Sequence, residues 1–259
     1  MSTIQEIAPG CFRLQTPFHL HGFINIKTHM NFIKLNSGRF VALSAVTLDE
    51  KALAQVNQLT QNGQLLEAVV GTNPFHTLAF KQFYDLFPNA KFYGTPRHIR
   101  NLDQIKWEGS VADELVRSLW SPEIEMRIPD GCEFDAPKPE NLNHFNGIIA
   151  FHRASGTLDD AFSVITDPSP IAKLFGSKQK RLVKFFLTFK SQGINKTPDA
   201  PRQFYDFWVS LLKDWEFDNL ATAHGDFLIG GGKKALLQCL EKEKGALSRL
   251  AVANGGIAF

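Results

Sequence analysis

Three apolar segments of this sequence lead into a side chain that can bind a metal ion or transfer a proton. The first segment ends at Val70 and is followed by His76, and two later segments lead into Asp167 and His224. Ligands of open α/β sheets gather at the carboxyl ends of strands, where these three residues are expected to lie. Two imidazoles and a carboxylate suit zinc, iron or manganese, and an open coordination position activates water. His76, Asp167 and His224 are therefore candidate metal ligands and candidate catalytic residues of a hydrolytic site.

The elements that must position these residues are short strands and amphipathic helices. Apolar runs bounded by turn residues predict strands at 7–14, 23–26, 32–35, 40–43, 68–70, 91–94, 124–128, 147–151, 162–165 and 220–223. Helical spacing predicts helices at 48–59, 80–87, 115–120, 201–215 and 233–243, with a further helix opening at Pro96. Thr47 and Glu50 have the spacing of a capping box before the first of them. Hairpins among alternating strands and helices fit helices packed outside two facing mixed sheets.

The composition excludes several classes of protein. A hydrophobic content of 44% and 23 phenylalanines indicate a globular chain with an aromatic interior, and we expect a single domain over residues 1–259. A net charge of +2 gives no reason to expect nucleic acid as a partner. Three widely spaced cysteines form no CxxC pair, which argues against a disulfide framework and a thiolate zinc site. The sequence shows no signal peptide and no apolar run long enough for a transmembrane segment, so we expect a cytoplasmic location.

The order of these motifs resembles that of the metallo-β-lactamase superfamily, and in particular a divergent branch grouped under a domain of unknown function. The resemblance rests on the opening segment 7–14, the segment Thr72-Asn73-Pro74-Phe75-His76-Thr77, a Gly-Thr-rich loop, Val164-Ile165-Thr166-Asp167 and Ala223-His224-Gly225-Asp226. It implies an α/β (α+β) fold, a four-layer αββα sandwich of the metallo-β-lactamase type. The resemblance also implies a site at one edge between the two sheets.

The metal-binding signature of that family, Thr-His-x-His-x-Asp-His, is degenerate here. Aligned on its threonine and the proline, the two histidines of the first metal fall on Asn73 and Phe75. The aspartate and histidine of the second metal fall on Thr77 and Leu78, and no histidine stands at 154–156, where the family has its next one. Phenylalanine and leucine side chains offer no lone pair to zinc. A dinuclear zinc centre is therefore not expected.

Two functions remain open. The first is a metallo-β-lactamase-fold protein that has lost two-zinc hydrolase activity and acts by binding, by scaffolding or by metal-free chemistry. The second is a mononuclear metal-dependent hydrolase of an ester, thioester, lactone or phosphoester. The cofactor is accordingly none in the first case, and one zinc, iron or manganese ion in the second. The small number of ligands favours the first function. A small-molecule ligand fits both, and the residues assigned to its pocket are Asn73, His152, Ser155, Thr157 and Asp159.

Several residues allow alternative interpretations. His76 is equally compatible with a ligand or acid–base role and with a histidine that hydrogen-bonds within its loop. The His-x-His pair of His19 and His21 has the spacing of a metal site on a strand but lacks a partner motif. The basic, aromatic segment 173–190 fits an anionic membrane surface or single-stranded nucleic acid. We favour an amphipathic helix with a buried phenylalanine face for this segment, and we expect His98 to be a surface or loop residue.

Overall fold

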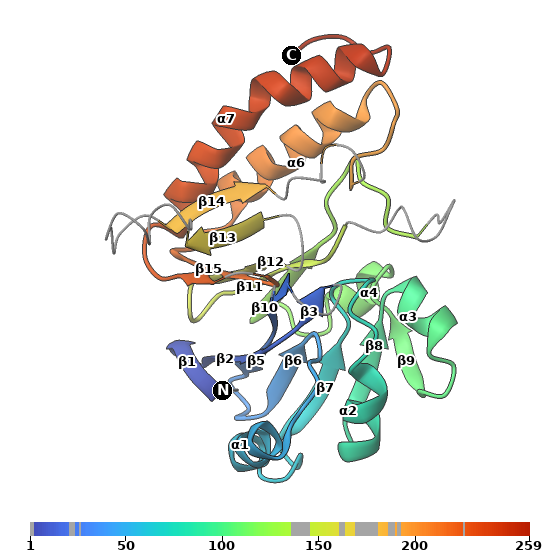
Figure 1. Ribbon diagram of the computed structural model, residues 1–259, viewed down its shortest axis with the longest axis vertical. Coiled ribbons are helices and arrows are strands. Elements are labelled where there is room, and N and C mark those ends of the chain that lie inside the picture. The colour runs from blue at the N-terminus through green and yellow to red at the C-terminus, as the bar shows by residue number, and fades with distance from the viewer. Residues whose placement is uncertain are drawn as a thin grey trace. The chain divides into compact units, whose positions relative to one another are not determined.

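The computed structural model describes residues 3–20, 24–25, 27–135, 146–160, 164–168, 181–185, 190, 193–224 and 226–259 (Figure 1). The chain divides into two compact units. Unit 1 consists of Met1–Met126 and His152–Thr157, and unit 2 consists of Arg127–Phe151 and Leu158–Phe259. Each unit has its own cluster of buried apolar side chains.

Unit 1 is built around a seven-stranded mixed sheet with the order β1-β2-β5-β6-β7-β8-β9. Its strands are β1 (Thr3–Ala8), β2 (Cys11–Thr16), β5 (Thr28–Lys34), β6 (Phe40–Leu43), β7 (Leu66–Val70), β8 (Lys91–Gly94) and β9 (Trp107–Ser110). The strands β1, β2, β5 and β6 pair antiparallel, and β6 to β9 pair parallel. Its helices are α1 (Glu50–Thr60), α2 (Phe80–Leu86), α3 (Pro96–Asn101) and α4 (Glu114–Arg117).

One face of this sheet carries the core of unit 1. Alternate strand residues such as Leu14, Phe32 and Val69 are fully buried in one cluster with Phe80 and Phe83 of α2. The aromatic stripe predicted at 80–87 is therefore a packing face, as helical spacing indicates.

The start of α1 differs from the prediction. Asp49 is the N-cap, and its side chain accepts a hydrogen bond from Ala52 N at 2.7 Å. The expected capping box of Thr47 and Glu50 is wrong because the backbone of Leu48 is used elsewhere. The Gln82 side chain bonds both the N–H and the carbonyl oxygen of Leu48, which holds that residue outside the helix.

The direction of the strands defines two edges of this sheet. Because β6, β7 and β8 run parallel, the residues that follow them all lie at one edge, called here the carboxyl edge. The opposite, amino edge includes Lys34 at the end of β5, which pairs with Phe40 at the start of β6. Lys34 N also donates to Gly10 O at 2.8 Å, so the turn between β1 and β2 belongs to the amino edge.

Unit 2 contains most of a second sheet, of order β10-β11-β12-β15-β16, and a two-stranded sheet of β13 and β14. The strands are β10 (Ile124–Arg127), β11 (Ile149–His152), β12 (Thr157–Asp160), β13 (Val164–Pro168), β14 (Arg181–Phe185), β15 (Asn219–Thr222) and β16 (Phe227–Leu228). The helices α6 (Ala200–Asp214) and α7 (Gly232–Ala253) pack side by side (Figure 1). A further strand pair, β3 (His19–Leu20) and β4 (Ile24–Asn25), belongs to unit 1.

The helices of unit 2 are buried along one face each. Phe204, Trp208 and Leu211 of α6 are buried in one cluster with Leu236 and Leu240 of α7. The helix predicted at 201–215 is confirmed. The helix predicted at 233–243 extends to Ala253, because buried Leu247 and Ala251 continue its apolar face.

Some segments differ from the sequence-based predictions. The strands β9 and β12 (Thr157–Asp160) were not predicted. The amphipathic helix expected in the basic, aromatic segment is wrong for Arg181–Phe185, which is strand β14 and pairs antiparallel with β13. Most of that segment and His21 lie outside the described residues. No helix among the described residues is long and apolar enough to cross a membrane.

Gly131 provides a test of the packing of unit 2. Its φ is 71°, and a Cβ atom there would lie 2.2 Å from the backbone oxygen of Ala200 at the start of α6. Gly231 has the same φ of 71°, but a Cβ there would meet nothing within 4 Å. We expect Gly231→Ala to cost about 1–2 kcal/mol, the penalty of a left-handed backbone for an L-residue. Gly131→Ala should cost roughly 1–3 kcal/mol more, because helix α6 must shift.

Urea unfolding followed by tryptophan fluorescence measures both variants. Gly231→Ala is the matched control because both glycines belong to unit 2 and share one backbone conformation. Equal losses of stability in the two variants would contradict the close approach of Gly131 to α6.

Candidate functional site

The loops that follow β6, β7 and β8 bring polar side chains together at the carboxyl edge of unit 1. Ser44 follows β6, Asn73 and His76 follow β7, and His98 lies on α3 just after β8. Ser44 has a φ of 67°, which is uncommon for a residue other than glycine. Its N–H donates to Val70 O at 2.8 Å, which fixes this turn beside the end of β7. The three loops therefore form one hydrogen-bonded group.

Asn73 determines the shape of the loop after β7. Its side chain is buried, and its Oδ1 accepts a hydrogen bond from Phe75 N at 2.9 Å. This is an Asx turn, in which an asparagine replaces a backbone acceptor. Since Oδ1 faces an N–H group, the amide Nδ2 faces His76 Nε2, at 3.4 Å.

The contacts of His76 indicate its tautomer. Asn73 Nδ2 is a donor, so His76 Nε2 accepts and its proton lies on Nδ1. Nδ1 lies 3.4 Å from Ser44 Oγ, which then accepts from the ring. In this arrangement the Ser44 hydroxyl is not activated by the imidazole, because a general base would have to accept the proton of that hydroxyl. The ring of the half-buried His76 thus lies between the side chains of Asn73 and Ser44.

His98 supports the loop from below, and the expectation that it is a surface or loop residue is wrong. It is fully buried, and its Nε2 lies 3.3 Å from the backbone oxygen of His76. A carbonyl oxygen only accepts, so Nε2 carries the proton, while Nδ1 accepts from Thr95 Oγ1 at 2.7 Å. A Cβ atom at Gly71 would lie 2.9 Å from the His98 ring, so only glycine leaves room for it. Burial lowers the pKa of His98 to about 4.

The sequence does contain a signal for the position of His98. Thr95 is the N-cap of α3, Pro96 opens the helix, and His98 N donates to Thr95 Oγ1 at 3.3 Å. The third residue after an N-cap threonine often bonds back to the cap. A histidine at that position is therefore turned toward the helix start, which here lies against the carboxyl edge.

Phe75 occupies the position of a histidine in the family signature, and its ring has a different contact. The guanidinium of Arg97 lies 4.7 Å from the centre of the Phe75 ring, a cation–π arrangement. Leu78, also at a ligand position of that signature, has a side chain that is 80% exposed. Neither side chain has an atom that can coordinate a metal, so these residues do not fit a dinuclear zinc centre. Within the part of the chain that the structure describes, no group of three or more His, Cys, Asp or Glu residues could hold a metal ion.

The other two candidate ligands belong to unit 2, whereas His76 belongs to unit 1. Asp167 lies in β13, where it pairs with Leu182 of β14. His224 is half-buried two residues after β15, and its backbone oxygen accepts from Thr222 Oγ1 at 2.8 Å. This bond closes the turn that carries the imidazole.

His152, Ser155 and Thr157 form a second polar cluster in unit 1. His152 Nδ1 lies 2.8 Å from Ser155 Oγ, which donates to Thr157 Oγ1 at 2.8 Å. Burial lowers the pKa of His152, and the Glu123 carboxylate acts in the opposite direction. A Cβ atom at Gly10 would lie 3.7 Å from His152 Cε1, so this histidine packs at the amino edge.

Within unit 1, the residues assigned to a substrate pocket lie at two opposite edges of the sheet. Asn73 is at the carboxyl edge of unit 1 with His76, whereas the cluster of His152, Ser155 and Thr157 is at the amino edge. Asp159 lies in β12 and is buried, with 8% of its surface exposed, and belongs to unit 2. Within unit 1 the structure does not bring the histidine cluster together with Asn73.

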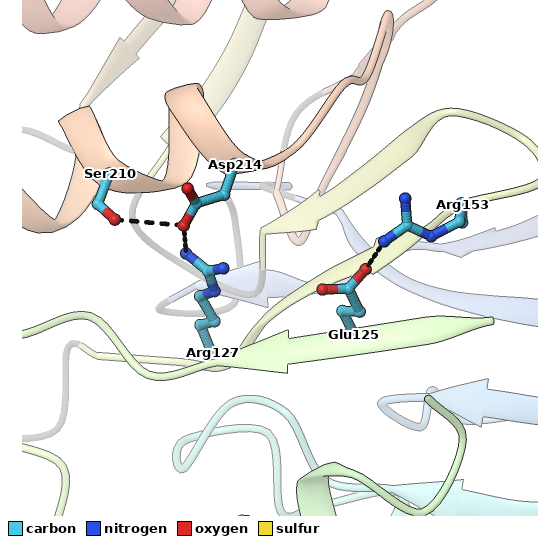
Figure 2. A network of polar contacts seen from close by, with 5 residues as sticks. All are labelled: Glu125, Arg127, Arg153, Ser210 and Asp214. Carbon is cyan, nitrogen blue, oxygen red and sulfur yellow. Dashed lines mark hydrogen bonds and ion pairs between the residues drawn. The ribbon is translucent and has the colours of Figure 1, made fainter. Parts of the chain in front are cut away.

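Two charge pairs involve residues of β10 (Figure 2). Arg127 Nη1 donates to Asp214 Oδ2 at 2.8 Å, and Ser210 Oγ donates to the same oxygen at 3.3 Å. The hydrogen bond from Arg127 lowers the pKa of Asp214. Arg153 pairs with Glu125. Such surface pairs contribute little to stability.

Comparison with known proteins identifies the fold. No protein-family model and no curated protein matches the sequence. Among solved structures, the DIM-1 metallo-beta-lactamase is 14% identical, with 93% of this chain and 97% of that chain covered and a TM-score of 0.62. A metallo-beta-lactamase from Hirschia baltica is 10% identical, with 92% of this chain and 97% of that chain covered and a TM-score of 0.60. FIM-1 from Pseudomonas aeruginosa, in its mono-zinc form, is 11% identical, with 93% and 95% covered and a TM-score of 0.57.

These matches show that the chain has the metallo-β-lactamase fold. The predicted α/β fold class is confirmed. At identities of 10–14% the likeness concerns the fold and not the chemistry.

The buried His98 predicts a loss of stability in mild acid. Its pKa is about 4 in the folded chain and about 6.5 when exposed, so between these values the unfolded state binds more protons. Stability therefore falls as the pH drops from about 6.5 to about 4, and it is unaffected by this group above pH 7. Between pH 7 and pH 5 we expect the contribution of His98 to fall by about 2 kcal/mol.

Urea unfolding of wild-type protein and His98→Gln at pH 7 and pH 5 measures this contribution. The variant lacks the titrating group. Its free energy of unfolding should therefore fall by about 2 kcal/mol less than that of the wild type when the pH drops from 7 to 5. An identical pH dependence in both proteins would show that His98 is not held neutral.

Proposed function

We propose that this protein uses the metallo-β-lactamase fold without a two-zinc centre and acts as a binding protein for a small ligand, with no metal cofactor. The observation that carries the proposal is the hydrogen bond from Phe75 N to Asn73 Oδ1. It commits the Asn73 side chain to the turn of its own loop, at a position where the family signature has a histidine.

The neighbouring contacts support the same conclusion. A neutral carboxamide is a weak ligand compared with imidazole or carboxylate for zinc. Its nitrogen faces His76 Nε2 at 3.4 Å, and a metal ion would have to displace it to reach that lone pair. Phe75 and Leu78 supply no donor atoms at all. This loop therefore offers zinc a single imidazole, which is already hydrogen-bonded, whereas a zinc site needs three or four ligands.

The chemistry left at the carboxyl edge is hydrogen bonding. Ser44, Asn73 and His76 provide hydroxyl, carboxamide and imidazole groups, and none of these carries a fixed charge. Arg97, over the ring of Phe75, provides a positive charge beside the same loop. A small polar ligand with carbonyl or carboxylate oxygens suits such donors.

The alternative is a mononuclear metal-dependent hydrolase of an ester, thioester, lactone or phosphoester, with His76, Asp167 and His224 as ligands. The order of these residues along the chain and their positions in or after strands favour it. One structural neighbour is described in a mono-zinc form, which indicates that a single ion can be held in this fold. In that alternative the metal supplies an activated water when it is bound, and His76 must turn away from Asn73 to become a ligand.

Metal content separates the two proposals. The protein is incubated with zinc, iron or manganese, desalted and subjected to elemental analysis, together with His76→Ala and His224→Ala. If the site is lost, all three proteins retain less than about a tenth of an equivalent, because too few ligands are present for tight binding. One equivalent in the wild type that both variants lose would refute the metal-free proposal and establish the mononuclear one.

A further inference from the structure

Unit 1 contains a groove at its amino edge, away from the strand-end loops that carry His76. The groove lies between the second half of α1 and the ends of β1, β2, β5 and β6, and it encloses about 720 Å³. This is within the size range of small-molecule sites in proteins. We propose that the groove binds a short peptide with apolar side chains and free termini, such as a dipeptide.

The floor of the groove is aromatic. Phe12 of β2 and Phe40 of β6 contact each other edge to face, with ring centres 5.9 Å apart. Leu59 of α1 is only partly buried and forms part of the wall. Phe12 and Leu59 present apolar surface to a ligand, while Phe40 is 3% exposed and supports Phe12 from beneath. An apolar side chain placed on Phe12 and Leu59 removes their surface from water.

Opposite charges stand at the rim. Glu6 on β1 and Lys34 on β5 are both exposed and line the groove, and β2 lies between their strands. Two strand spacings separate the backbones by about 10 Å. Glu6 Oε1 accepts from Gly10 N at 2.9 Å, which holds the carboxylate in place. Among the described residues the Lys34 ammonium has no ion pair or hydrogen bond. A free amino terminus complements the carboxylate, and a free carboxyl terminus complements the ammonium.

Amide side chains line the groove on the helix side. Gln58 lies in the last turn of α1 and Gln61 is its C-cap, three residues later, so they are neighbours on the helix surface. Each carboxamide offers one acceptor and two donor hydrogens, the complement of a peptide bond. Gln55, one turn earlier, already bonds a backbone group in this way, because its Oε1 accepts from Ile4 N at 3.0 Å. The apolar floor, the two opposite charges at the rim and the amide side chains together match a zwitterionic peptide better than a lipid or a polyanion.

This site is independent of the proposed function. The groove includes Phe40 and Leu65, at the amino ends of β6 and β7, whereas His76 follows the carboxyl end of β7. Metal binding or its absence at His76 therefore leaves the peptide proposal unchanged.

Isothermal titration of the full chain with leucyl-leucine tests the proposal. We expect saturable binding with a Kd of about 1 mM, which corresponds to a binding free energy of about −4 kcal/mol. N-acetyl-leucyl-leucinamide, which has the same side chains and no charges, should bind several-fold more weakly. Lys34→Gln and Glu6→Gln should each raise the Kd for leucyl-leucine about threefold, since an exposed ion pair contributes at most about 1 kcal/mol.

Matched controls make each outcome decisive. Glu6→Gln keeps the oxygen that accepts from Gly10 N, so the turn is preserved. Lys81→Gln removes a charge from the exposed surface of α2, outside the groove, and should leave the Kd unchanged. No saturable heat up to about 10 mM peptide, ten times the expected Kd, would overturn the proposal. Equal binding of the blocked peptide, or equal effects of Lys34→Gln and Lys81→Gln, would overturn it as well.

Discussion

A single carboxamide organises the strand-end loop of unit 1. Asn73 is buried with its oxygen bonded to Phe75 N, and this bond orients the rest of the side chain. The amide nitrogen then faces His76 Nε2, and His76 Nδ1 lies beside Ser44 Oγ, so the three side chains form one row. Breaking the bond would leave the partly buried amide N–H of Phe75 without its acceptor, which costs about 1 kcal/mol. The local structure thus resists a rearrangement that would turn His76 away from Asn73.

The support beneath this loop depends on a second histidine, which is more deeply buried than His76. His98 is fully buried, and it connects Thr95 at the start of α3 with the backbone of His76. It can do so only as a neutral ring, because it accepts on Nδ1 and donates on Nε2. The aromatic ring of Phe80, 4.5 Å away, provides an apolar surrounding in which a charged imidazole is unfavourable. Burial and hydrogen bonding therefore act together to fix one tautomer and, through it, the position of the loop.

The sequence predicts much of this architecture because local patterns and tertiary packing agree there. The run before Gly71 is strand β7, the stripe of Phe80 and Phe83 is a buried helix face, and the apolar spacing from Phe204 to Leu212 is helix α6. These segments carry strong periodicity, and burial follows the same period. The motif order also predicts the fold class, which the structural neighbours confirm.

Other features depend on contacts between distant segments and could not be predicted locally. The strand β9 has only four residues and includes a glycine, so its sequence lacks a clear alternation. Helix α7 continues past Gly245 because Leu247 is buried against the rest of unit 2. The burial of His98 depends on the absence of a side chain at Gly71, the residue that directly follows strand β7. At the candidate site, the residue types were visible in the sequence, but the hydrogen-bond directions that set their protonation were not.

The stability of unit 1 rests on its buried apolar side chains, to which the loop at Asn73 contributes little. Metal ligands are difficult to replace where the ion itself supplies the folding energy, as in small zinc domains. Here each unit has its own cluster of buried apolar side chains, and the loop at Asn73 lies at the edge of one of them. Its turn is closed by a side chain–backbone hydrogen bond. The exposed side chains at the carboxyl edge can therefore differ with little effect on the packed core of unit 1.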